Sequence, residues 1–289
     1  MFYFYAIGSM LGYSLQQTLL VHHARKIDGL SLVFYRNISF VITLLPLLIG
    51  ASNEDIRAVL AHWQMLMISG FAGAFFLALI FLSYKFLTAG ISSTISMAIS
   101  NIMMVILGWL FLSEVLSGVS ILLIGVILTG TVLLGLQHAH MPHLDSRFAL
   151  GITIVIIGSL PVAYVKFVLA ILSRQTSPLV AGYFWETSIG IACLILLLAR
   201  SIVFGNNIQK ISWSQFGLIA ACAWPTLIGT ALYSLALHSG PLGIVGAIGC
   251  GSLVITALLA WSWYNERVTI GQWMSMALIL AGIIGLKFV

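Results

Sequence analysis

Long apolar stretches, separated by short polar connections, make up almost the whole sequence. Ten stretches of about twenty residues follow one another, and only 7% of the residues are charged. A hydrocarbon core of ~30 Å needs roughly 20 helical residues to cross it, because every backbone polar group must be bonded within the segment. Each stretch therefore predicts a transmembrane helix, and the predicted spans are residues 2–22, 31–50, 65–87, 91–112, 116–137, 148–172, 179–203, 215–237, 242–263 and 269–288.

The connections between the predicted spans are too short to form a soluble domain. The three longest are residues 51–64, 137–147 and 204–214, so successive helices are expected to be antiparallel neighbours. The mean hydropathy of +1.13 agrees with this. The first residues also lack the positive charges of a cleaved signal peptide. The expected fold class is an all-α integral membrane protein.

The sequence matches itself when it is shifted by about 150 residues, and small and polar residues coincide as well as apolar ones. An odd number of helices per copy means that the second copy crosses the membrane in the opposite direction, as in transporters with inverted repeats. We therefore expect two inverted five-helix repeats, residues 1–138 and 148–289, joined by a linker of residues 139–147. The matched pairs are Gly8-Ser9 with Gly158-Ser159, Phe34-Tyr35-Arg36 with Phe184-Trp185-Glu186, Gly90 with Gly240, Ser92, Ser96 and Ser100 with Gly243, Ala247 and Gly251, and Glu114 and Gly130 with Glu266 and Gly282.

Some of these motifs carry a resemblance to a known family. The chain resembles the ten-helix exporters of the EamA group in the drug/metabolite transporter superfamily, which have an Arg or polar residue early in the second helix of each half and a Glu after the fourth. Arg36, Leu112-Ser113-Glu114 and Tyr264-Asn265-Glu266 match this pattern. The family often has Pro thirteen residues before each Glu, where this chain has Asn101 and Leu253. The resemblance implies a transporter of small metabolites with both termini in the cytoplasm.

Three charged residues lie inside predicted spans and at least five residues from their ends, and they are Arg36, Lys166 and Glu186. A charge at the bilayer centre costs ~2.5–3.5 kcal/mol on insertion scales, so it marks a functional site or an internal pair. At 1.5 Å per residue, Lys166 and Glu186 should lie ~10 Å below the same membrane face, and we expect them to pair. The pair is either a structural contact or a gating pair, in which Lys166 releases Glu186 when a proton or a substrate amine arrives to bind to Glu186.

Arg36 is the predicted anchor for a substrate carboxylate or phosphate, because its planar guanidinium group can bind either in a bidentate manner. The alternative is that its side chain extends toward the nearby membrane face. Asn101 is expected either to face a cavity or to bond to another helix. Glu114 and Glu266 follow helix ends, and we expect both to have a structural role at the membrane interface.

Aromatic residues fall at two depths in the predicted spans. Six of the eight Trp lie near span ends, as in an interfacial belt. Trp185 and Trp224 lie deeper, and Pro225 is expected to bend the eighth span and to leave backbone carbonyls facing a cavity. The deep rings either line a site for an aromatic or cationic metabolite or fill helix interfaces, and they include Tyr13, Tyr35, Tyr164 and Tyr183.

Several function classes are disfavoured by the sequence. The formal net charge is +5, but the 12 Lys and Arg residues form no basic block, which argues against a nucleic-acid partner. No phosphate-binding GxxxxGK[ST] loop and no catalytic motif occurs, so we expect neither an ATP-driven pump nor an enzyme. The Cys residues lack CxxC spacing, and His138, His140 and His143 fall in the linker, so neither a metal nor a cofactor is expected.

These observations predict a secondary transporter that moves a small polar metabolite, an amino acid or a related amphipathic compound, across the inner plasma membrane by alternating access. Export coupled to protons is favoured, and the partners are the small-molecule substrate and the lipid bilayer, with a monomer or homodimer as the assembly. The alternatives are an uptake facilitator for a charged nutrient or cation, choline-like or nucleotide-like, and a channel. The distribution of Lys and Arg would place both termini outside, but we expect the orientation of the family.

Overall fold

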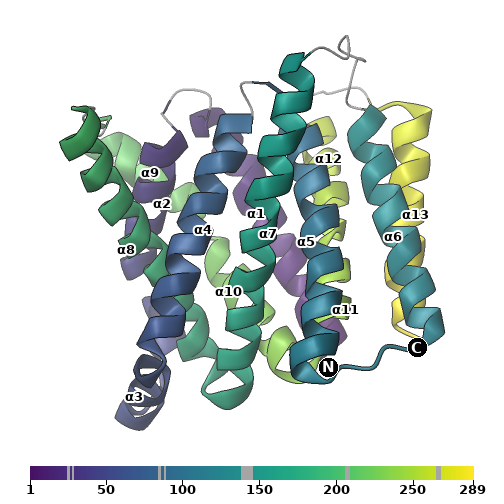
Figure 1. Cartoon of the computed structure of the whole chain (residues 1–289), viewed down its shortest axis with the longest axis horizontal. Helices are drawn as coiled ribbons and strands as arrows, with labels where there is room; N and C mark the ends of the chain where they lie inside the picture. Colours follow the sequence, from purple (N-terminus) through teal and green to yellow (C-terminus); the bar gives the residue numbers. More distant parts are fainter. Residues whose placement is uncertain are drawn as a thin grey trace.

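The computed structural model describes residues 1–24, 27, 29–83, 86–87, 89–137, 146–205, 209–264 and 268–289. Every regular element in these residues is a helix, and the helices stand side by side with both chain termini at the same end of the bundle (Figure 1). The predicted all-α class is therefore confirmed for the described part of the chain.

The described residues before the linker form α1 (Phe2–Ala24), α2 (Gly29–Thr43), the 3-10 helix η1 (Leu45–Leu48), α3 (Asn53–Ala61), α4 (Trp63–Ser83), α5 (Ala89–Leu112) and α6 (Gly118–Gln137). The described residues after it form α7 (Ser146–Gln175), α8 (Pro178–Phe204), α9 (Trp213–Ala223), α10 (Thr226–Ser239), α11 (Leu242–Gly249), α12 (Gly251–Tyr264) and α13 (Ile270–Leu286). Most of the extensive contacts join helices that are far apart in the sequence, such as α1 with α10 and α6 with α13.

Seven segments in the described chain are long and apolar enough to cross a membrane, and α2 and α13 are shorter apolar helices. Two of the seven are pairs of consecutive helices, α9 with α10 and α11 with α12. α1 has 23 residues but carries the polar residues Gln16 and Gln17. The prediction of a membrane protein with several spanning helices is confirmed, whereas the count of ten spans stays a prediction.

α3 is a helix that the hydropathy pattern missed, because residues 51–64 contain too few apolar residues to span a membrane. It begins with a capping box, in which Ser52 Oγ accepts a hydrogen bond from the Asp55 backbone N–H and the Asp55 carboxylate accepts one from the Ser52 backbone N–H. The Ser52 hydroxyl also donates to Asp55 Oδ2 at 2.7 Å, and this bond, together with the one from the Ser52 backbone N–H, lowers the pKa of Asp55 below its ordinary value by stabilising the carboxylate. The Ser-x-x-Asp spacing was the signal for this helix.

Two of the expected spans are interrupted near their middle. The eighth breaks at Trp224 and Pro225, between α9 and α10, and this confirms the bend expected from Pro225. The ninth breaks at Cys250, between α11 and α12, and the residue is flanked by Gly249 and Gly251. Glycines weaken a helix locally, but the sequence pattern did not single out this position. Pro161, by contrast, lies inside the uninterrupted α7.

The contacts between helices relate the two halves of the chain. The sequence repeat matches α1 with α7, α2 with α8, α4 with α9–α10, α5 with α11–α12 and α6 with α13. α1 packs against α10 and α12, while α7 packs against α4 and α5, so each of these α1 contacts has its counterpart at α7. α2 packs against α8, α5 against α11 and α6 against α13, so these contacts join matched helices. A twofold relation between the halves produces such contacts between matched helices. The predicted boundaries of the two halves stay predictions.

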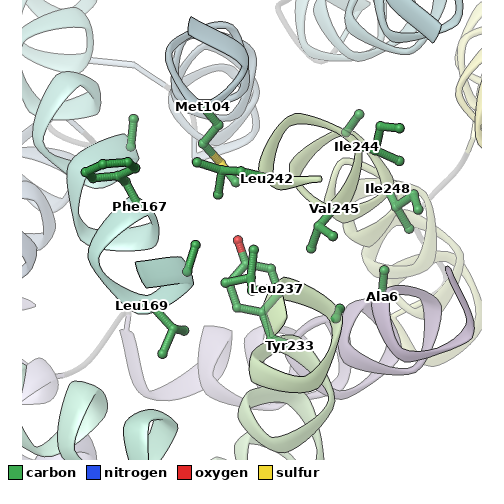
Figure 2. Packing of buried hydrophobic residues seen from close by; sticks show 14 of the residues in the cluster. Ala6, Met104, Phe167, Leu169, Tyr233, Leu237, Leu242, Ile244, Val245 and Ile248 are labelled. Carbon is green, nitrogen blue, oxygen red and sulfur yellow. The ribbon is translucent and has the colours of Figure 1, made fainter. Parts of the chain in front are cut away.

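The main apolar core lies where α10 and α11 meet the helices around them. Leu237 and Leu242, on either side of the α10–α11 turn, are fully buried. Figure 2 shows them beside Tyr233, with Phe167 of α7 and Met104 of α5 in the same cluster. The α10–α11 turn is therefore anchored by packing against both halves of the chain.

α1 and α10 approach each other so closely that only glycine fits at the contact. A Cβ atom on Gly12 would lie 2.7 Å from the backbone nitrogen of Gly229 and 3.0 Å from the carbonyl oxygen of Pro225. Small residues allow such backbone contacts between membrane helices. Gly12 thus sets α1 directly against the start of α10, next to the break at Pro225.

We predict that Gly12→Ala lowers the melting temperature of the purified protein, because the added methyl group must push α1 away from α10. Overpacking of this kind costs about 1–3 kcal/mol. Gly125→Ala on α6 is the matched control, since a Cβ there meets nothing within 4 Å, and it should leave the melting temperature unchanged or slightly raised. Equal melting temperatures of the two variants would contradict the close contact.

Candidate functional site

A buried carboxyl group lies at the centre of the candidate site. Glu186 of α8 follows Pro178 by eight residues and is only 2% exposed. The Thr230 hydroxyl on α10 donates a hydrogen bond of 3.2 Å to Glu186 Oε1. The Tyr13 hydroxyl on α1 lies 3.0 Å from Thr230 Oγ1, so Tyr13 can donate to Thr230 while Thr230 donates to Glu186. Three helices from both halves therefore meet at this carboxyl group.

Arg36 of α2 supplies the positive charge at this site. Its charge acts on both Glu186 and Tyr13, although no nitrogen of Arg36 lies within 4.0 Å of the Glu186 carboxylate in the described structure. The guanidinium group lies 4.7 Å from the centre of the Phe40 ring, and Nη1 donates a 3.2 Å hydrogen bond to Asn37 Oδ1. Asn37 Nδ2 in turn donates to the Glu186 carbonyl oxygen at 3.4 Å. Arg36 is thus held beside Glu186 and inside the protein.

The expected direct pair between Lys166 and Glu186 is wrong for this structure. Lys166 forms no ion pair among the described residues, and its charge acts on Cys250 instead. The reason is the rotation of 100° per residue along a helix. Trp185 is the α8 residue that faces α7, where its Nε1 donates a 2.9 Å hydrogen bond to the Val165 carbonyl oxygen. Glu186, one residue further, turns toward α10. The directions of the two side chains were therefore predicted wrongly, whereas their depth in the membrane stays a prediction.

Asn101 lies with Cys250 and not with Glu186. Asn101 of α5 is 2% exposed, and its Nδ2 donates to Cys250 Sγ at 2.7 Å. This contact between α5 and the α11–α12 break is the interhelical bond that was one of two alternatives for Asn101. Its Oδ1 is buried and has no hydrogen-bond partner in the described structure.

Four of the deep aromatic residues do not contribute a polar atom to the Glu186 carboxyl group. Three of them bond to backbone carbonyl oxygens, and the fourth is largely exposed. Trp185 donates to Val165, and the Tyr183 hydroxyl donates to the Val41 carbonyl oxygen at 3.2 Å. The Tyr35 hydroxyl donates to the Gln209 carbonyl oxygen in an exposed contact. Trp224 is 52% exposed at the α9–α10 break. The structure therefore brings together three of the predicted site residues, Tyr13, Arg36 and Glu186.

The sequence analysis missed three residues of this cluster. Asn37 and Thr230 are fully buried and bond to the backbone and the carboxylate of Glu186, respectively. Tyr233 stands edge-on to Tyr13, with 6.1 Å between ring centres, and its hydroxyl has no hydrogen-bond partner in the described structure. The position of Asn37 next to Arg36 was a usable signal. Thr230 and Tyr233 lie four and seven residues after Thr226, where the sequence offers no distinguishing pattern.

A comparison with known protein families identifies the family of the chain. The model of the EamA-like transporter family matches residues 1–136 and again residues 149–288. The chain belongs to the EamA-like transporter family. No curated protein matches the sequence. In structure, 29 solved chains match this family member. One of them, a crystal structure of a protein, covers 97% of this chain and 96% of its own with a TM-score of 0.73, and its 14% sequence identity shows the fold alone.

In this EamA-like transporter, Glu114 joins the two halves just after the end of α5. Its Oε1 lies 2.5 Å from Arg174 Nη2 at the end of α7, and its carboxylate accepts the Leu242 backbone N–H at 2.8 and 3.0 Å. Arg174 also donates to the carbonyl oxygens of Leu237 and Gly240 at the end of α10. Glu114 has the structural role that we expected, whereas Glu266 and the linker His residues lie outside the described residues.

We predict that Glu114→Gln and Arg174→Gln each lower the stability of the transporter by about 1–3 kcal/mol, because each removes charged hydrogen bonds from a partly buried network. The double variant should lose less than the sum, as expected for residues in direct contact. Glu54→Gln on the exposed surface of α3 is the control and should have no effect. Additive losses in thermal unfolding would refute the coupling between Glu114 and Arg174.

Proposed function

We propose that the chain is a secondary transporter that moves a small polar metabolite with a basic nitrogen, an amino acid or a related amphipathic compound, across the cytoplasmic membrane. Membership of the EamA-like transporter family supports transport as the activity. The proposed mode is export by alternating access, in exchange for protons. Tyr13, Arg36 and Glu186 form the proposed binding site, together with Asn37, Thr230 and Tyr233.

The observation that carries this proposal is the buried carboxyl group of Glu186. A carboxylate in the middle of a membrane protein is costly unless it is compensated, and such residues commonly hold a proton, an ion or a substrate charge. Glu186 receives a hydrogen bond from Thr230 but no direct ion pair within the described structure. It therefore has acceptor positions left for a proton or for an ammonium group, and the binding of one would exclude the other.

The contacts between matched helices support an inverted arrangement of the two halves. The repeat matches α1 with α7, and it also matches the helices that contact α1 with those that contact α7. α2 contacts α8, the helix with which the repeat matches it. Arg36 belongs to the first half and Glu186 to the second, so the proposed site lies at the contact between halves. A site in this position can be exposed to either membrane face when the halves tilt against each other.

A second candidate is an uptake facilitator for a cation. The edge-on pair of Tyr13 and Tyr233 beside the Glu186 carboxyl group favours it, because aromatic faces and a carboxylate together suit an organic cation. In that case transport would follow the membrane potential and would not require protons. Liposomes with a pH gradient but no membrane potential decide between the two candidates. Proton exchange would accumulate the substrate under these conditions, whereas a facilitator driven by the potential would not.

We expect purified protein in liposomes to show counterflow, in which unlabelled substrate trapped inside accelerates the uptake of labelled substrate. Counterflow requires a binding site that faces the two sides in turn, and a channel cannot produce it. The assay begins with each of the twenty L-amino acids and continues with the corresponding amines. Uptake that is insensitive to trapped substrate, for every compound that enters, would contradict the proposed carrier mechanism.

We predict that Glu186→Gln abolishes proton-driven transport and leaves substrate counterflow independent of pH, because the amide can neither bind nor release a proton in this range. The melting temperature should stay close to that of the natural protein, since Gln can still accept the hydrogen bond from Thr230. Glu54→Gln on α3 is the control and should keep the pH dependence. If Glu186→Gln transports with an unchanged pH profile, Glu186 is not the proton site.

A further inference from the structure

The hydroxyl group of Thr230 lies between groups from both halves of the chain. Its Oγ1 lies 3.2 Å from Glu186 Oε1 on α8 and 3.0 Å from the hydroxyl oxygen of Tyr13 on α1. α1 belongs to the first half of the chain, whereas α8 and α10 belong to the second. The two hydrogen bonds therefore connect the halves directly at the proposed binding site.

The packing around Thr230 holds its oxygen atom in place. Gly182 lies one turn before Glu186 on α8, and a Cβ on it would lie 3.0 Å from the methyl carbon of Thr230. On the other side, a Cβ on Gly229 would lie 3.3 Å from the ring of Tyr13. Another rotamer of Thr230 would have to fit between these close neighbours. The hydroxyl hydrogen is therefore the part of this side chain that can turn without repacking.

The direction of the two hydrogen bonds depends on the charge of Glu186. A carboxylate only accepts hydrogen bonds, and a hydroxyl group has a single hydrogen to donate. While Glu186 is ionised, the hydrogen of Thr230 points to it, so Tyr13 must be the donor in its bond to Thr230. Once Glu186 is protonated, its own O–H can donate to Thr230, and the hydrogen of Thr230 can turn toward Tyr13. Protonation therefore removes the constraint that makes Tyr13 the donor.

The strength of the connection depends on the same charge. Hydrogen bonds to an ionised acceptor are roughly twice as strong as those between neutral groups, and bonds in a chain strengthen one another. A proton that reaches the carboxylate from the water, or an ammonium group that binds to it, neutralises the charge and weakens both bonds. Arg36 does not remove this difference, because its guanidinium group is charged in every state.

The bond between Tyr13 and Thr230 lies where the halves meet most closely. Tyr13 follows Gly12, whose contact with Gly229 places α1 directly against α10. Thr230 follows Gly229 and lies soon after the break at Pro225. A displacement of α1 relative to α10 therefore has to stretch or break the Tyr13–Thr230 bond.

We propose that Tyr13 and Thr230 form a lock that holds the two halves together while Glu186 is ionised and empty, and that releases them when a proton or a substrate ammonium group neutralises Glu186. This inference rests on the proposed function and explains why it is an exchange. Only a loaded transporter can change the side to which its site opens. One molecule leaves only when a proton or another molecule returns, because the empty transporter stays locked.

The groups around Glu186 leave the lock under the control of its own charge. Arg36 of α2 acts on Glu186, and Tyr233 of α10 stands edge-on to Tyr13. Among the other helices that pack against α8, α4 carries no charged residue, and the charged residues of α3 lie near its exposed first turn. α7 meets α8 through Trp185, and it brings no ion pair to Glu186 in the described structure.

The first test needs no substrate and uses the purified full-length protein. It compares the loss in melting temperature on Tyr13→Phe in the natural protein with the loss in Glu186→Gln. The second loss should be at most half of the first, because the neutral amide forms only an ordinary hydrogen bond with Thr230. Thr226→Val is the control and should cause no loss in either protein, since Thr226 Oγ1 is buried without a hydrogen-bond partner in the described structure. Equal losses on Tyr13→Phe in the two proteins would overturn the lock.

The second test measures the efflux of labelled substrate from liposomes into an alkaline medium without substrate. The natural protein and Thr226→Val should release the label slowly, and added acid or unlabelled substrate outside should accelerate the release by about tenfold. Thr230→Val keeps the shape of the side chain without the hydroxyl group, and this variant and Tyr13→Phe should release the label quickly without either addition. Thr230→Ser restores the hydroxyl group and should restore slow efflux. Trapped sucrose should stay inside in every case.

The efflux separates a lock from a bond that only stabilises the fold. If Thr230→Val and Tyr13→Phe lower the melting temperature but release the label as slowly as the natural protein, the proposal is overturned. Fast efflux from the natural protein in the same medium also overturns it. If no compound shows counterflow with the natural protein, the proposed function fails. The comparison of melting temperatures then decides alone, and a halved loss upholds the link between Glu186 and α1.

Discussion

A charge in the hydrocarbon region of a bilayer needs compensation from within the protein, and this constraint organises the centre of the molecule. Glu186 has a hydrogen bond from Thr230 and the opposite charge of Arg36 nearby. These partners come from α2, α8 and α10, which belong to both halves of the chain. The polar centre therefore also determines how the halves are set against each other, since moving either half alters the compensation of the buried carboxyl group.

Hydropathy located the membrane segments because a stretch of about twenty residues without polar groups has a high mean hydropathy, and the same stretch is stable in lipid. It could not find α3, whose start depends on hydrogen bonds between Ser52 and Asp55. It also could not find the break at Cys250, because the segments on both sides are equally apolar. Pro225 was a visible signal for the other break, since proline lacks the backbone donor that a continuous helix requires.

The candidate site shows a second limit of the sequence, which places a residue along its helix but does not give the direction of its side chain. Trp185, and not Glu186, occupies the side of α8 that faces α7. Which face of a helix meets which neighbour depends on the packing of all the helices. The partners of Tyr35 and Tyr183 depend on the same packing, because their hydroxyl groups bond to the backbone of other segments. Their place in the substrate site stays a prediction.

The breaks at Pro225 and Cys250 make the two halves mechanically unequal. In the first half, α4 and α5 run without interruption, whereas the matching helices of the second half are each divided into two rods. Bending at an existing joint disturbs fewer backbone hydrogen bonds than bending a continuous helix. Deformation of this molecule will therefore concentrate in the C-terminal half, with the N-terminal half serving as the stiffer frame.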